Sequence, residues 1–227
     1  TLKDLASRRG SDSLPGASEA CFRAQTIVDN IGDRRGRLDR EGDFDVLDGA
    51  LHAFLTDEFD PIMRDTTCWS RVCLAGRFHE ELSPDLRTLS PSDFGFHNAL
   101  RTDGGKIVFL DFEYFGWDDP VKLIADFIWH PAMTLSDDHK KRWLENSFII
   151  FKNTEEIQQR FHAAWPLYGI RWAMILLNEF RKDGWEKKLH VDENVEKFRE
   201  KNFSEQIDKA VAKCDLIKSN QMECPYV

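Results

Sequence analysis

The chain has 227 residues, of which 41% are hydrophobic and 31% are charged, a composition that predicts an ordered globular protein. Its 40 acidic and 31 basic residues give a formal net charge of -9, which argues against a general nucleic-acid-binding protein, because such a protein needs a basic face. No apolar stretch is long enough to cross a membrane and the five cysteines are scattered, so we expect a cytoplasmic protein with neither a disulfide framework nor a zinc knuckle.

The first third of the sequence has the periodicity of helices. Residues 17 to about 38 place apolar side chains on one helical face. Residues 42–45 supply a helix start, and the apolar periodicity that follows continues to Phe59. Pro61 is expected to end this second helix, because proline lacks the backbone N–H that a helix interior needs. Residues 62–82 predict a further helix.

The pattern changes in the middle of the chain. Two short apolar segments, 98–101 and 106–110, flank the sequence Thr-Asp-Gly-Gly at 102–105, which is a strong signal for a β-hairpin. These residues predict two strands joined by a tight turn.

The remainder of the sequence, after Pro120, is helical in pattern. Helices are predicted at about 121–130, 137–151, 155–181 and 193–213. Pro166 is expected to kink or divide the third of them. We therefore predict one domain over residues 1–227, mainly α with a small central β-hairpin.

Three polar residues stand around the predicted hairpin. Asp93 and Asn98 lie five residues apart on the loop before it, and Asp111 follows its second strand directly. Phosphoryl transfer needs a carboxylate beside the attacking hydroxyl and hard oxygen ligands for Mg²⁺, and this set contains both. Side chains at strand ends and on loops are where such groups belong.

The order of these motifs resembles a known superfamily. Asp93-x-x-x-x-Asn98, a hairpin and then Asp111-Phe-Glu resemble the catalytic and metal-binding loops of protein-kinase-like enzymes. The following Gly-Trp-Asp-Asp-Pro at 116–120 and Leu-Ile-Ala-Asp-Phe at 123–127 are similar to the aminoglycoside phosphotransferase and choline kinase branch. The resemblance implies a kinase-like C-terminal lobe, with its catalytic and metal-binding loops at about 86–127 and a helical subdomain at about 128–227.

The resemblance also implies roles for individual residues. Asp93 matches the catalytic base, while Asn98 and Asp111 match the metal-binding positions. Residues that match architectural positions of the family are Asp118 or Asp119 and Asp126. The implied cofactors are ATP and Mg²⁺, and the implied substrate is a hydroxyl group of a small molecule, with no nucleic-acid or membrane partner.

The loop departs from the family pattern at several positions. Pro91 and Ser92 stand where the family has His and Gly, and Phe-Gly-Phe-His fills the space between Asp93 and Asn98. These departures leave the class of acceptor open. His97 is interpreted as a structural loop residue, because the family motif does not use that position.

The sequence lacks the features with which kinases grip a nucleotide. No Gly-rich strand-turn-strand occurs before residue 90, no lysine occurs between Lys3 and Lys106, and no sheet is predicted between 17 and 85. We therefore expect the C-terminal lobe alone, with the N-terminal lobe absent from this chain. The alternative is a non-catalytic, degenerate lobe that binds a small molecule or a protein partner. A Mg²⁺-dependent phosphate-ester hydrolase is disfavoured, since no further acidic cluster offers a second metal site.

Overall fold

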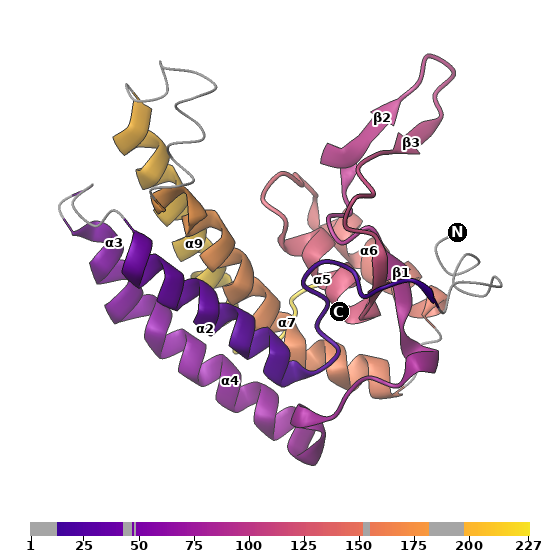
Figure 1. Ribbon diagram of the computed structural model, residues 1–227, viewed down its shortest axis with the longest axis horizontal. Helices are drawn as coiled ribbons and strands as arrows, with labels where there is room; N and C mark the ends of the chain where they lie inside the picture. The colour runs from indigo at the N-terminus through magenta and orange to yellow at the C-terminus, as the bar shows by residue number, and fades with distance from the viewer. Residues whose placement is uncertain (1–12, 43–46, 48, 152–154, 182–197) are drawn as a thin grey trace.

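A computed structural model describes residues 13–42, 47, 49–151, 155–181 and 198–227, which are mainly α-helical with two small antiparallel sheets (Figure 1). The helices are α2 (Ala24–Glu41), α3 (Ala50–Ala53), α4 (Asp60–Leu74), α5 (Pro120–Trp129), α6 (Asp137–Ile150), α7 (Glu155–Leu176) and α9 (Arg199–Ser219). The strands are β1 (Thr88–Ser90), β2 (Ala99–Arg101), β3 (Ile107–Phe109) and β4 (Gly116–Asp118). The expected mainly α class is confirmed, and so is the central hairpin, in which β2 pairs with β3. None of the described helices is long and apolar enough to cross a bilayer.

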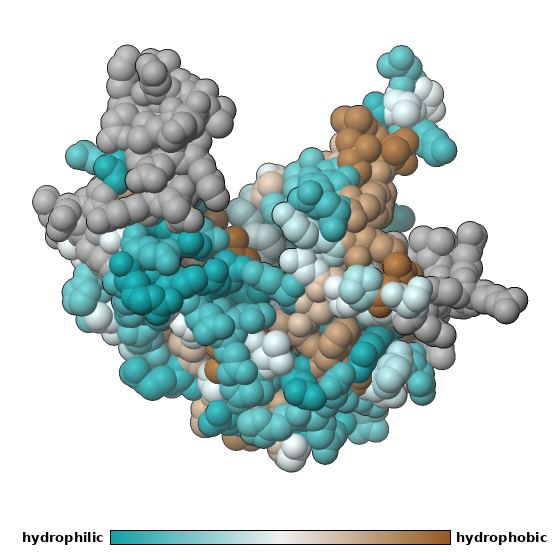
Figure 2. Space-filling model, in the orientation of Figure 1, coloured by the Kyte–Doolittle hydropathy of each residue, from teal (hydrophilic) through white to brown (hydrophobic). Residues whose placement is uncertain are grey.

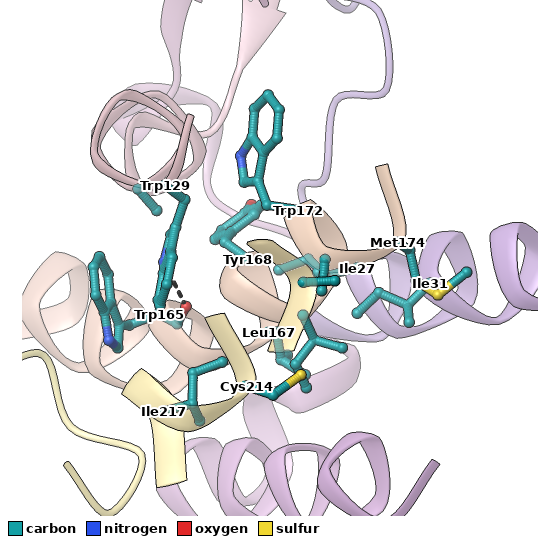
Figure 3. Packing of buried hydrophobic residues seen from close by; sticks show 14 of the residues in the cluster. Ile27, Ile31, Trp129, Trp165, Leu167, Tyr168, Trp172, Met174, Cys214 and Ile217 are labelled. Carbon is teal, nitrogen blue, oxygen red and sulfur yellow. Dashed lines mark hydrogen bonds between the residues drawn. The ribbon is translucent and has the colours of Figure 1, made fainter. Parts of the chain in front are cut away.

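Helix α7 is the centre of the helical body and packs against α2, α4, α5 and α9 (Figure 1). Most of its side chains are buried, Trp165 and Tyr168 almost completely (Figure 3). Burying a large apolar side chain stabilises a fold by roughly 1.5–3 kcal/mol, so packing rather than helix propensity holds α7. Gly169 is part of this packing, because a Cβ there would lie 2.6 Å from the Trp129 ring and 2.8 Å from Ile217.

Pro166 does not divide α7, which runs unbroken from Glu155 to Leu176. Proline at this position leaves the carbonyl of His162, four residues earlier, without its helical donor. The indole N–H of Trp69 on α4 donates to that carbonyl at 3.4 Å. The expected division is therefore wrong, because a neighbouring helix supplies the hydrogen bond that proline removes.

Pro61 does not end its helix either. Residues Phe54–Phe59 form a π-helical turn that runs directly into α4, and Pro61 occupies the first turn of α4. Because the preceding turn is π-helical, the amide of Asp60 donates to the carbonyl of Leu55, five residues earlier, and the helix runs on through Pro61 with this altered hydrogen-bond pattern. The expected stop at Pro61 is wrong, and α4 then covers most of the helix predicted over 62–82.

Helix α2 begins at Ala24, later than the predicted residue 17. The residues before it are drawn into tertiary contacts, because the amide of Ala17 donates to the carbonyl of Trp117 (2.8 Å) and the amide of Ser18 to that of Tyr114 (3.1 Å). Glu19 adopts a left-handed backbone at φ 54°. Long-range hydrogen bonds thus replace the first turns that the local periodicity predicts.

The second sheet, β1 with β4, was not predicted. Thr88 pairs with Asp118 and Ser90 with Gly116 across a long stretch of intervening chain. Its strands have three residues each and lack an alternating pattern in β1, whose side chains are all buried. The helices predicted at 121–130, 137–151 and 155–181 agree closely with α5, α6 and α7, the last of which continues into a short 3-10 turn, Leu177–Phe180. The helix predicted at 193–213 overlaps α9, which ends at Ser219, later than expected. Residues 193–197, like most of the predicted helix start at 42–45, lie outside the described residues.

Candidate functional site

The loop between β1 and β2 carries Asp93 and is anchored from three directions. The amide of Ser92 donates to the side-chain oxygen of Ser90 (3.0 Å), and the Ser92 hydroxyl donates to the carbonyl of Ser18 (2.9 Å). The buried ammonium group of Lys122 on α5 lies 3.4 Å from the same hydroxyl. Ser92 is also in the left-handed region at φ 68°, a strained backbone that these contacts maintain.

Asp93 and Asn98, the predicted base and one predicted metal ligand, are in direct contact. The Asn98 side-chain amide donates to the Asp93 carbonyl at 3.0 Å and to Oδ2 of its carboxylate at 3.2 Å. Since the amide nitrogen faces Asp93, the side-chain oxygen of Asn98 is the atom that it would offer to a metal ion.

Asp111, the second predicted metal ligand, reaches the same region through the backbone. The amide of Leu110 donates to the carbonyl of Asn98 at 2.8 Å, so the residue after Leu110 leaves the hairpin beside Asn98. Asp111 is exposed and has φ 60°, a left-handed conformation that Asp tolerates better than most residues. The structure thus joins Asp93 to Asn98 by side chain and Asn98 to the Asp111 segment by main chain.

Two histidines complete the surroundings of Asp93. Nε2 of His97 lies 2.9 Å from Oδ1 of Asp93, and Nε2 of His130, just after α5, lies 3.5 Å from the same oxygen. The two imidazole rings stack with 4.0 Å between centroids and an interplanar angle of 7°. Burial, followed by the nearby His97, lowers the pKa of His130 below its usual value, so His130 is neutral at pH 7.

The sequence did not predict the proximity of either histidine to Asp93. The interpretation of His97 as a structural loop residue is compatible with its hydrogen bond to the Asp93 carboxylate in the same loop. A signal for it existed in the four-residue spacing from Asp93 within one tight loop. His130 gave no local signal, because only the packing of α5 under the loop brings it to Asp93.

The aspartates expected to be architectural lie in a buried charge cluster behind the loop. Lys122 pairs with Asp118 at 2.9 Å and with Asp126 at 3.5 Å. Burial alone would lower the pKa of Lys122, but the two carboxylates raise it, so the ammonium group stays charged. Asp119 accepts the amide of Val121 at 2.8 Å and so caps α5.

Two arginines of α7 bind the same cluster. Arg160 pairs with Asp119, and Arg171 lies 3.3 Å from Asp126. The arginines tie α5 to α7, and Lys122 links the cluster to Ser92 beside Asp93. The cluster therefore fixes the site loop relative to the helical body.

Two cavities flank Trp143 next to this loop. One, of about 560 Å³, is lined largely by apolar side chains that include Phe94, Phe109 and Phe112. The other, of about 470 Å³, is lined by Phe96 and Phe127 with the polar Arg142 at its wall. The loop of Asp93 contributes to both cavities, and the segment of Asp111 contributes to the first.

Two residue sets of the described chain could hold a metal ion. Asn98 and Asp111 offer hard oxygen ligands of the kind that Mg²⁺ prefers. Asp93, His97 and His130 each place one ligand atom within 4.8 Å of the others. The second set is disfavoured by the backbone amide of Ala132, which donates to Nδ1 of His130 at 3.1 Å and so leaves the ring proton on Nε2, facing Asp93.

Comparison with known proteins assigns no family to this chain. No protein-family model matches the chain, and no curated protein is significantly similar to it.

Proposed function

We propose that this chain is the kinase-like C-terminal lobe of a phosphotransferase that uses ATP and Mg²⁺ to phosphorylate a hydroxyl group of a small molecule. The observation that carries the proposal is the gathering of Asp93, Asn98 and the Asp111 segment by two hydrogen bonds. The resemblance of the same motifs to aminoglycoside phosphotransferases and choline kinases supports it.

Asp93 acts as the base in this proposal. Its carboxylate is 47% exposed, which leaves it accessible to an acceptor. The acceptor oxygen forms a bond to the γ-phosphorus while the bond from that phosphorus to the β–γ bridging oxygen breaks, and its electron pair leaves with ADP. The hydroxyl proton passes to Asp93.

Asn98 and Asp111 would hold Mg²⁺, through the side-chain oxygen of the first and the carboxylate of the second. When bound, the ion would supply positive charge against the phosphate oxygens. Among the described residues, neither Asp93 nor Asp111 is paired with a lysine or arginine. Both carboxylates are therefore open to a cation that binds from solution.

A nucleotide-gripping lobe completes the enzyme and covers the hairpin. The hairpin and the segment after it expose large apolar side chains, which gather on one side of the molecule (Figure 2): Leu100 (59%), Ile107 (50%), Val108 (38%), Leu110 (43%), Phe112 (47%) and Tyr114 (49%). Exposed apolar clusters of this kind mark interaction surfaces. We place the second lobe on this face, either on the same polypeptide or on another.

The proposal is tested by following ADP release from the native protein with a panel of amino-sugars, amino alcohols and neutral sugars. Acceptor- and Mg²⁺-dependent ADP release is the expected result. No acceptor-dependent release in the presence of the nucleotide-gripping lobe would overturn the proposal. The matched control omits Mg²⁺ and adds EDTA.

A non-catalytic binding module is the second candidate, favoured by the missing Gly-rich loop and nucleotide lysine. Titration of the 227-residue chain with ATP, with and without Mg²⁺, separates the two. Mg²⁺-dependent binding that is lost in Asp111→Asn supports the phosphotransferase. Binding of a small molecule or protein without any nucleotide requirement supports the module.

A further inference from the structure

His97 forms a hydrogen bond with the carboxylate of Asp93, and the ring of His130 stacks on the ring of His97. Nδ1 of His130 accepts a hydrogen bond from the amide of Ala132, so the proton of the neutral ring is on Nε2, which lies 3.5 Å from Oδ1 of Asp93 without forming a hydrogen bond to it. Nε2 of His97 lies 2.9 Å from the same oxygen, a distance at which a carboxylate requires a proton between the two atoms.

The stacking of the two rings disagrees with a shared metal ion. Each imidazole directs its lone pair within its own ring plane, and the two planes here are nearly parallel at 7° and face each other at 4.0 Å. Two lone pairs in such planes do not converge on one point. A metal-ligating histidine, moreover, usually donates a hydrogen bond from its other ring nitrogen, whereas Nδ1 of His130 accepts one from the amide of Ala132.

The position of His130 is fixed from the core. Its ring meets Trp172 of α7 edge-on at 4.6 Å, and the indole N–H of Trp172 donates to Asp126 at 2.7 Å. Asp126 is in turn held by Lys122 and Arg171. A continuous set of contacts therefore connects the buried charge cluster to the carboxylate of Asp93.

We propose that His97 is a positioning residue that holds the carboxylate of Asp93 through Oδ1, and that the stacked ring of His130 holds His97 in place. A carboxylate oxygen has two lone pairs, and His97 occupies one of those on Oδ1. Oδ2 accepts a hydrogen bond from Asn98, so the two contacts together fix the orientation of the carboxylate and leave a lone pair on each oxygen open to the acceptor. The effect on the reaction rests on the proposed phosphotransferase, whereas the hydrogen bond of His97 does not.

The hydrogen bonds are tested by nitrogen-15 NMR of the imidazole rings in the 227-residue chain, without nucleotide or acceptor. We expect a proton on Nε2 of both histidines at neutral pH and a shift of the Nε2 resonance of His97 in Asp93→Ala, with His79 as the unchanged control. An Nδ1–H tautomer of either ring would overturn the proposal. Stoichiometric Zn²⁺ binding that disappears in His97→Gln would also overturn it, because the set would then be a metal site.

The effect on the reaction is tested in the native protein with a pair of substitutions at His97. Glutamine places an amide donor where Nε2 of His97 lies, whereas leucine removes the donor and keeps the bulk. We expect kcat to fall about 10²-fold in His97→Leu, as misplaced catalytic groups do, with KM for ATP unchanged and with most of kcat restored in His97→Gln. Equal loss in both variants would contradict positioning by hydrogen bonding. Failure of all acceptors with the wild-type protein would overturn the proposed function, and the NMR spectra alone would then decide whether the hydrogen bond of His97 forms.

Discussion

The carboxylates of this protein fall into two regions with opposite surroundings. Asp118, Asp119 and Asp126 are buried around α5, and each is paired with a lysine or an arginine. Asp93 and Asp111 are exposed around the hairpin, and within the described residues neither has such a pair. A buried carboxylate must be paired by the fold itself, whereas an open one is available to a ligand.

The comparison also explains how the open region keeps its shape. The site loop packs Phe94 against Phe127 of α5 and Trp143 of α6. The hydrogen bond from Lys122 to Ser92 and the contact of His130 with Trp172 connect the loop and its surroundings to the buried region. The two regions should therefore respond differently to substitution. Changes in the open region should affect chemistry, and changes in the buried region should affect folding.

The largest effect is expected for Asp93→Asn. Asparagine keeps the size of the side chain but cannot accept the acceptor proton, so phosphotransfer should fall by about 10²–10⁴-fold. Stability should change by less than about 1 kcal/mol, because the residue is exposed and unpaired by any lysine or arginine of the described chain. Asp103→Asn, at the tip of the hairpin, is the control and should leave the rate unchanged. A full rate in Asp93→Asn would remove Asp93 from the role of base.

The buried region is tested by Lys122→Met. Methionine leaves Asp118 and Asp126 short of a counter-charge in the interior, which should lower the free energy of unfolding by about 3–5 kcal/mol. Urea unfolding followed by tryptophan fluorescence measures this change. Lys201→Met is the control, because Lys201 pairs with Glu205 on the surface at 3.9 Å and should contribute less than about 0.5 kcal/mol. Similar losses in both variants would show that the comparison of buried and open charges is mistaken.

Glu19 lies between the two extremes, since it is paired but its side chain is 39% exposed. Burial alone would raise its pKa, but Arg171 and Arg34 outweigh burial and lower the pKa to about 2. A pKa that is lower in the folded than in the unfolded state stabilises the fold above the unfolded value of 4.5, and this stability is lost as the pH falls toward about 2.

The corresponding prediction concerns Glu19→Gln. Solvent screening limits the loss of stability at neutral pH to about 1 kcal/mol. The difference in urea midpoint between wild type and variant should shrink as the pH falls from about 6 to about 3.5. Glu205→Gln, on the exposed face of α9, should show no such convergence. A constant difference across this range would rule out the ion pairs of Glu19 as the source of its effect.

Local patterns in the sequence were sufficient to predict the hairpin, α5 and α6, and to single out Asp93, Asn98 and Asp111 as neighbours around the hairpin. Each depends on turn chemistry, periodicity or spacing within a short stretch. The β1–β4 sheet, the place of His130 and the late start of α2 depend on contacts between distant segments, which no local pattern records. The effects of Pro61 and Pro166 were predicted wrongly for the same reason, because the surrounding structure determines how much stability a helix loses when proline removes an N–H.

Pro166 provides the last and smallest test, which asks whether a neighbouring side chain compensates for the N–H that proline lacks. It extends the comparison from buried carboxylates to a buried backbone carbonyl. The indole of Trp69 donates to the carbonyl of His162 that Pro166 leaves without a helical partner. Because the bond is long, at 3.4 Å, Trp69→Phe should lower the free energy of unfolding by only about 0.5 kcal/mol beyond the packing loss. In a Pro166→Ala background the helix regains its own donor, so the same substitution should cost less by about that amount, and a double-mutant cycle measures the difference. A coupling energy of zero would mean that solvent or strain, rather than Trp69, compensates for the proline. The fold would then supply partners for the buried charged groups but not for this buried carbonyl.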